Sequence, residues 1–137
     1  MFQIIVLIPS KVRFLNLRCC HYLTDAIIVE ITHAPNLLQV TSIDLSYSHH
    51  LTDISGIALA SSPQKLQQVI FDGCPNLTDA ALNALVKRQI HSMEQMSFMD
   101  CPLISKRAVT NVRWQVPNLE LLTSHLQQLE KSAASVA

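Results

Sequence analysis

One phrase recurs four times along this chain of 137 residues: a short apolar stretch, a cysteine or serine, and then Leu-Thr or Ile-Ser. When the copies are aligned on the hydroxyl residue, its intervals are 28, 26 and 27 residues. The four aligned residues are Thr24, Thr52, Thr78 and Ser105. Such spacing is typical of solenoids, in which one supersecondary unit is stacked on the next. The repeat therefore constrains the fold more than any other feature of the sequence.

Each unit reads apolar-x-x-apolar-x-apolar-x-x-Cys/Ser-x-x-Leu/Ile-Thr/Ser. The alternating apolar residues predict a short strand with one buried face. The last apolar column of the strand consists of Leu17, Leu45, Phe71 and Phe98. The next column holds Cys20, Ser48, Cys74 and Cys101. We expect it at the corner where the chain leaves the strand, because a small side chain can be buried there and still reach a backbone group.

A helix is predicted to follow each corner. The Thr or Ser is expected to cap its first N–H groups, and Asp25, Asp53 and Asp79 suit the positive end of its dipole. Apolar residues then lie four and seven positions after the cap, at Ile28 and Ile31, Leu82 and Leu85, and Val109 and Val112. The second unit deviates with Gly56, and Ile57 and Ala60 fit if one residue is inserted. Prolines precede the next strand, at Pro9, Pro35, Pro63 and Pro117.

The units resemble the cysteine-containing subtype of leucine-rich repeat that is typical of F-box/leucine-rich-repeat proteins. The resemblance spans about residues 9 to 123 and departs from the pattern at Ser48, after Ser105, and by two residues inserted between Pro35 and Val40. It implies a right-handed α/β solenoid with a parallel sheet on the concave face and helices on the convex face. Residues 1–123 are expected to form about four units, and residues 124–137 a C-terminal helix and tail. A fifth strand is expected to begin around Leu119 and Leu122, with Ser124 in the next column.

The resemblance implies protein–protein recognition, as the substrate-binding region of an F-box-type ubiquitin-ligase adaptor. The partner would be a protein substrate or scaffold, and cullin–RING ligase subunits would be reached only through segments missing from this chain. The alternative is a non-F-box repeat protein that acts as a scaffold or assembly factor, for example in mitochondria. We expect a cytoplasmic or nuclear protein. The apolar segment FQIIVLI indicates a chain that starts inside a repeat: a fragment, a truncated gene model, or an end buried against another domain.

Composition argues against several other classes of protein. Ten basic and ten acidic residues give a net charge of zero, so neither nucleic acid nor an anionic membrane is an expected partner. The apolar run from Ile4 to Ile8 is too short to span a bilayer. The four cysteines show no disulfide framework, which favours reduced thiols.

Partner contacts are predicted on the strand positions that alternate with the apolar columns. The candidate residues are Phe14, Asn16, Arg18, Asp44, Ser46, Ile70, Asp72, Ser97 and Met99. Ser42, Gln68 and Gln95 share this face. The mixture is typical of a protein-contact surface and lacks the several Lys or Arg of a nucleic-acid surface. A solvated face without a ligand is the alternative.

Catalysis, cofactors and metals are not expected. Cys19, Cys20 and His21 could approach His49 and His50 one repeat away, but Cys20 already belongs to the buried column. Cys74 and Cys101 have no histidine at their loop positions, and no phosphate-binding or hydrolase motif occurs. Trp114, the single tryptophan, is expected to pack against the turn that follows the last helix.

Overall fold

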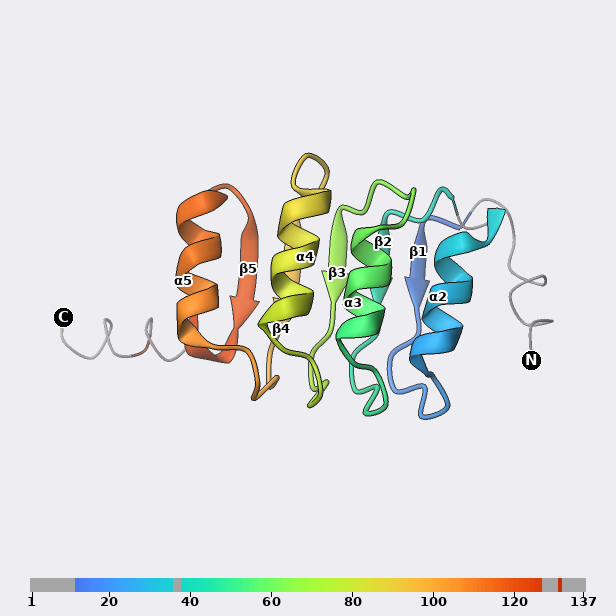
Figure 1. The fold of residues 1–137 in the computed structure, drawn as a ribbon, viewed down its shortest axis with the longest axis horizontal. Coiled ribbons are helices and arrows are strands. Elements are labelled where there is room, and N and C mark those ends of the chain that lie inside the picture. The colour runs from blue at the N-terminus through green and yellow to red at the C-terminus, as the bar shows by residue number, and fades with distance from the viewer. Residues whose placement is uncertain (1–11, 36–37, 127–130, 132–137) are drawn as a thin grey trace.

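The computed structural model describes residues 12–35, 38–126 and 131. Within these ranges, five strands alternate with four helices (Figure 1). The strands are β1 (Phe14–Asn16), β2 (Ser42–Asp44), β3 (Gln68–Ile70), β4 (Gln95–Phe98) and β5 (Glu120–Thr123). The helices are α2 (Asp25–His33), α3 (Asp53–Ala60), α4 (Asp79–Gln89) and α5 (Lys106–Gln115). The alternation of strand and helix predicted from the repeat is confirmed.

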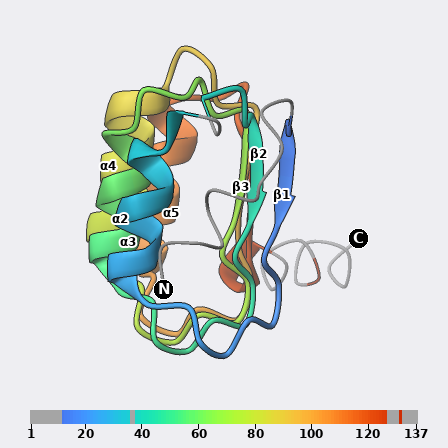
Figure 2. The same cartoon turned by 90° about the vertical axis from the view of Figure 1, so that its right-hand side faces the viewer.

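The strands form one parallel sheet in the order β1-β2-β3-β4-β5, so each unit pairs with its neighbours in sequence. Equivalent residues of the first four repeats are paired, as in the step from Ile43 to Val69 and from Val69 to Met96. The four helices lie side by side on one face of the sheet (Figure 2). The arrangement is that of stacked α/β repeat units.

The core fills the space between the sheet and the helices. Leu45, Phe71 and Phe98 of the last strand column are buried, and Leu17 at the sheet edge is partly buried. The rings of Phe71 and Phe98 stack with their centroids 5.7 Å apart. Such a pair adds about 1 kcal/mol to the stabilisation from burial. The prediction that this column forms one continuous stack is confirmed.

The caps and buried stripes of the helices match the repeat. Thr24, Thr52, Thr78 and Ser105 are the N-caps, and each side-chain oxygen accepts a hydrogen bond from an N–H of the first turn. The apolar residues predicted four and seven positions after the cap are buried in α2, α4 and α5.

The inserted residue proposed for the second unit is wrong. Gly56 and Leu59 occupy the fourth and seventh positions and are buried, whereas Ile57 is 46% exposed. Gly56 is required by a close helix approach, because a Cβ on it would lie 2.5 Å from the Cβ of Ala81 in α4. The glycine therefore keeps the repeat length and lets α3 and α4 meet.

The expected alignment of the fifth strand is also wrong. In β5, Leu121 pairs with Met96, and Thr123 pairs with Phe98. Leu121 and Thr123 are buried, whereas Leu122 is 39% exposed. The step from Met96 to Leu121 is two residues shorter than the step from Val69 to Met96. Because side chains alternate across a strand, a one-residue error in alignment exchanges the buried and exposed sets.

Trp114 does not pack as expected, since 82% of it is exposed. Pro9, the apolar run from Ile4 to Ile8 and the tail after residue 126, apart from Lys131, lie outside the described residues. So do residues 36–37 of the segment between Pro35 and Val40, in which two residues were taken to be inserted. Among the helices of the described ranges, none is long and apolar enough to cross a bilayer.

We predict that Gly56→Ala destabilises the protein by about 1–3 kcal/mol, because the added methyl group overlaps Ala81. Helix propensity alone would give the opposite sign, a gain of about 1 kcal/mol. Urea denaturation measures the difference. Ala81→Gly in the same chain is expected to recover part of the loss, and a higher stability for Gly56→Ala alone would contradict the close approach.

Candidate functional site

The sheet face opposite the helices carries the residues predicted to contact a partner. Phe14 and Asn16 lie in β1, Asp44 ends β2, Ile70 ends β3, and Ser97 lies in β4. Arg18, Ser46, Asp72 and Met99 follow these strands. The sheet register brings all nine residues to neighbouring positions on one surface.

The nine candidate residues differ in how far their side chains are exposed. Phe14, Asn16 and Arg18 are exposed at the β1 edge, and Ile70, Asp72 and Met99 are half-buried in the middle of the sheet. Asp44, Ser46 and Ser97 are buried, with exposed fractions of 7%, 0% and 3%. These three short side chains offer almost no area to a partner, so contact on this face depends on the other six residues.

Tyr47 also belongs to this surface, although the alternating strand pattern does not indicate it. The guanidinium carbon of Arg18 lies 4.8 Å from the centre of the Tyr47 ring, and Arg18 Nη1 is 3.9 Å from Asp44 Oδ2. Cation–π stacking and the ion pair therefore hold the arginine over the sheet. Gly73 makes room for the ring, because a Cβ there would lie 2.4 Å from Tyr47 Cδ1.

A column of left-handed backbone sets this geometry. Tyr47 has φ 61° and Gly73 has φ 66°, and the equivalent residues Cys19 and Asp100 have φ 61° and 56°. Non-glycine residues adopt this region uncommonly. In the sequence, these four residues stand just before the Cys/Ser column. Their side chains differ too much for the position to be recognised as part of the repeat pattern.

Polar groups of the open face are largely bound to one another. Asp72 Oδ1 accepts hydrogen bonds from Ser97 Oγ at 2.6 Å and from the Met99 N–H at 2.8 Å. Gln68 donates to Gln95 of the next strand, and the Ser46 N–H donates to Asp44 at 2.9 Å. The side chains that remain available for contact are therefore mainly apolar or aromatic. Arg18 is the charged residue among them.

A second set of contacts joins the helix starts of successive units. Asp25 accepts from the Thr52 N–H at 2.9 Å and from Thr52 Oγ1 at 2.7 Å. Asp53 binds the backbone and hydroxyl of Thr78 in the same way, and Asp79 those of Ser105. We call Asp25, Asp53 and Asp79 the carboxylate ladder. From the sequence, these residues were assigned to the helix dipole alone, and the link that they make between units was missed.

Hydrogen bonding determines the ionisation of the first member of the ladder. Burial by itself raises the pKa of Asp25, but hydrogen bonds from Ser55 and Thr52 outweigh it and hold the pKa below the ordinary value of 3.8. The carboxylate is the form that accepts these bonds. The link between the first two units therefore requires an ionised Asp25.

The cysteine column makes a further set of links. Cys74 Sγ donates to the Leu45 carbonyl at 3.4 Å, and Cys101 Sγ donates to the Phe71 carbonyl at 3.0 Å. Burial raises the pKa of Cys74 to about 11 and that of Cys101 to about 12. At neutral pH both are protonated donors, as the corner position predicts.

Ser48 occupies the same column without an equivalent bond. It is 1% exposed, and its hydroxyl has no hydrogen-bond partner among the described residues. The C–O bond is shorter than the C–S bond, which leaves the hydroxyl farther from the neighbouring strand. This difference gives a physical reason for cysteine in the other units.

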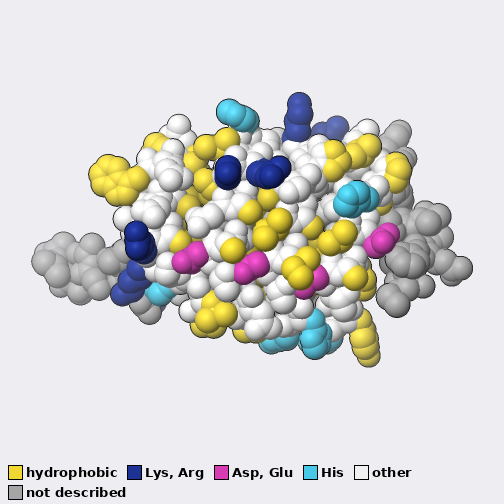
Figure 3. All heavy atoms as spheres, viewed as in Figure 1, with side chains coloured by type: hydrophobic (Ala, Val, Ile, Leu, Met, Phe, Trp, Pro, Cys, Tyr) yellow, Lys and Arg dark blue, Asp and Glu magenta, His cyan; other side chains and the backbone are white. Residues whose placement is uncertain are grey.

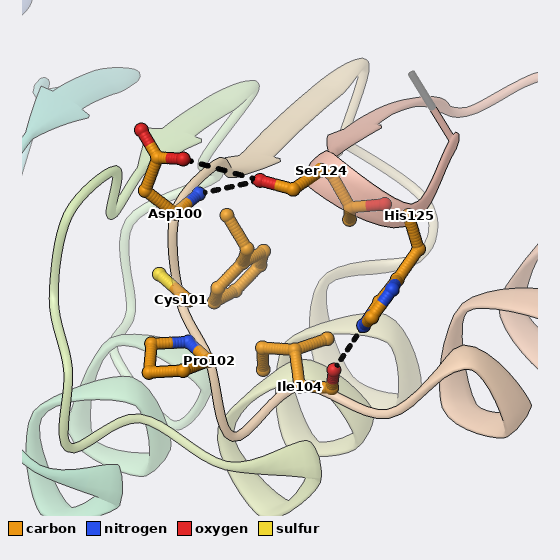
Figure 4. Close-up of a pocket in the computed structure, with 8 residues that line it drawn as sticks. Asp100, Cys101, Pro102, Ile104, Ser124 and His125 are labelled. Atoms are coloured by element: carbon orange, nitrogen blue, oxygen red, sulfur yellow. Dashed lines mark hydrogen bonds between the residues drawn. The ribbon is translucent and has the colours of Figure 1, made fainter. Parts of the chain in front are cut away.

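A small pocket of about 310 Å³ lies between the last two units (Figure 4). Phe98, Cys101 and Ile104 line it, and Thr123 occupies the column position that holds a phenylalanine in the two preceding units. At its edge, the Asp100 N–H donates to Ser124 Oγ at 2.8 Å, and His125 Nε2 lies 2.8 Å from the Ile104 carbonyl. The polar groups at this edge are thus hydrogen-bonded within the structure.

Metal ligands do not gather in the described part of the chain. No group of three or more His, Cys, Asp or Glu side chains there could hold an ion.

Comparison with known proteins supports the fold. A search of protein-family models finds no match to this chain. A chain in the crystal structure of the Rad7 and Elc1 complex in yeast is similar, with a TM-score of 0.68 and 18% sequence identity. The similarity covers 82% of this chain and 26% of that chain, so this chain spans about a quarter of its neighbour's length.

The cysteine column yields a reciprocal prediction. We expect Ser48→Cys to raise the free energy of unfolding by about 1 kcal/mol, because a thiol can reach a carbonyl that the hydroxyl does not. Cys74→Ser should lower it by a similar amount, since its bond to Leu45 weakens. Thermal melts of both variants measure the effect. Equal destabilisation by the two changes would contradict the assignment, and Leu77→Asp, which buries a charge at a fully buried site, should be far more damaging than either.

For the carboxylate ladder, we predict that Asp25→Asn lowers stability at neutral pH by about 1–3 kcal/mol, because the amide cannot accept the same bonds. A carboxyl with a lowered folded-state pKa contributes stability above the ordinary value of 3.8 and loses it as pH falls through the folded value. The two proteins should therefore converge in acid. Urea denaturation over this pH range tests the effect, with Glu30→Gln as control, an exposed acid on the same helix. A difference that persists in acid would count against the ladder.

Proposed function

We propose that the open face of the sheet is a protein-recognition surface. The observation that carries the proposal is the combination of bound polar groups with accessible Phe14, Ile70 and Met99 side chains beside the Arg18–Tyr47 stack. Aromatic residues, methionine and arginine are enriched in protein interfaces, and their central members contribute most of the binding energy. The neighbour of similar fold is part of a complex between two proteins, which agrees with this role.

The finer proposal is a right-handed leucine-rich-repeat solenoid whose sheet lines the concave face. Right-handed crossovers are nearly universal between parallel strands of one sheet, which favours this handedness. Together with the repeat pattern, this supports a role as the substrate-binding region of an F-box-type ubiquitin-ligase adaptor in the cytoplasm or nucleus. Neither catalysis nor a cofactor belongs to this proposal.

Site-specific photo-crosslinking tests the open face. A photoreactive phenylalanine analogue replaces Phe14, which is 51% exposed, or in the control Ile54 on α3, which is 57% exposed. We expect a discrete protein adduct from position 14 that is lost when Arg18→Glu is added, and no such adduct from position 54. Adducts of the same pattern from both positions would contradict recognition by the sheet.

The fate of the captured protein separates the adaptor from the scaffold. An adaptor's substrate should gain ubiquitin and be stabilised by proteasome inhibition when the intact gene product is expressed. The partner of a scaffold or assembly factor should keep its half-life under the same treatment.

A further inference from the structure

Helix α5 differs from α2, α3 and α4 at the two columns that face a following unit. One position after the cap, the carboxylate ladder has Asp25, Asp53 and Asp79, but α5 has Lys106. Eight positions after the cap, Thr32, Ala60 and Val86 are buried, with exposed fractions of 2%, 3% and 5%. The equivalent residue of α5, Arg113, is exposed. A further unit of the same kind would therefore meet two cations where it needs an acceptor and a small or apolar contact.

A groove lies beside these two cations. It has a volume of about 530 Å³, and its lining includes Val109, Pro117 and Leu126. Val109 is buried and Leu126 half-buried, whereas Lys106, Arg113 and Trp114 of the same lining are exposed. The groove thus has an apolar base and a rim that carries two positive charges and an indole. We call it, with these six residues, the end groove.

All charged side chains of α5 are positive. α5 contains Lys106, Arg107 and Arg113 and has no acidic residue, and the positive end of its dipole adds to the field. Among the described residues, none of these three takes part in an ion pair. In Figure 3, Lys and Arg lie at the end of the helical layer where α5 lies and also along its upper edge, while the acidic side chains form a row across the middle of the layer. The end groove therefore favours an anionic occupant.

Trp114 is the largest apolar side chain in the lining of the end groove. It is the single tryptophan of the chain and is 82% exposed. Tryptophan and arginine are the residues most enriched among the energetic hot spots of interfaces. Here the two follow each other in sequence, at the rim of an apolar groove.

We propose that the end groove binds an acidic segment of a partner protein, which inserts apolar side chains between Trp114 and the groove base. Lys106 and Arg113 pair with the acidic groups of the segment. The site is separate from the open sheet face, so it can be occupied or lost without changing recognition there.

Fluorescence of Trp114 gives a direct measurement, because no other tryptophan contributes. The full chain is titrated with a designed peptide in which glutamates flank a pair of leucines. We expect the emission to shift to shorter wavelength on binding, and the affinity to fall with added salt. The same peptide with lysine at each glutamate should cause no shift. Equal shifts with both peptides, or none with either, would overturn the proposal.

Charge-reversal variants assign the effect to the end groove. Lys106→Glu with Arg113→Glu should weaken binding of the acidic peptide by about tenfold or more. The matched control reverses Lys87 and Arg88, an exposed basic pair on α4. The affinity of this control variant for the acidic peptide should stay within about twofold of the value for the unchanged protein. Circular dichroism confirms that each variant is folded, and equal losses in both double variants would sink the assignment.

The free chain tests the two other possible occupants. Emission typical of water-exposed indole, independent of protein concentration, is expected if the groove awaits a partner. Short-wavelength emission at high dilution would mean that the chain covers its own groove. A shift that grows with concentration, together with dimers in sedimentation equilibrium, would mean that a second copy is the occupant. Either result overturns the proposal.

Discussion

The structure depends on one constraint: no strand–helix unit can satisfy its own surface. Each strand needs the next for its backbone hydrogen bonds, and each helix needs the adjacent helix to cover its flank. The cysteine thiols and the carboxylate ladder apply the same requirement at the corners, where Cys101 reaches back to Phe71 and Asp79 binds Ser105. Stability is thus located between the units more than within them.

Much of the fold could be predicted because the repeat samples each position four times. The column that contains Phe71 and the caps such as Thr78 are constrained by chemistry that must recur. Single departures were harder to interpret. Gly56 was taken as evidence of an insertion, because a missing side chain looks like a missing column until its neighbour Ala81 is known. The fifth strand was misaligned by one residue because the length of the repeat varies, and an error of one residue exchanges the buried and exposed sets of side chains.

The candidate site was less predictable, since exposure on a sheet depends on the size of cross-strand neighbours. Alternation correctly selects the open face but cannot tell that Ser46 is buried while Met99 is half-exposed. Tyr47 was missed because its side chain joins the surface through a left-handed backbone, not through the strand pattern. Trp114 was assigned to packing because nothing in the sequence shows which helix face lacks a neighbour.

The carboxylate ladder has a direction. In every step the acceptor belongs to the earlier unit and the donor to the later one, as with Asp25 and Thr52 or Asp53 and Thr78. Because a chain is synthesised from its N-terminus, each acceptor leaves the ribosome before the hydroxyl and amide groups that bind it. The units capped by Thr52, Thr78 and Ser105 thus each meet an acceptor that is already present on the unit before, and this part of the solenoid can be assembled in the order in which it is translated.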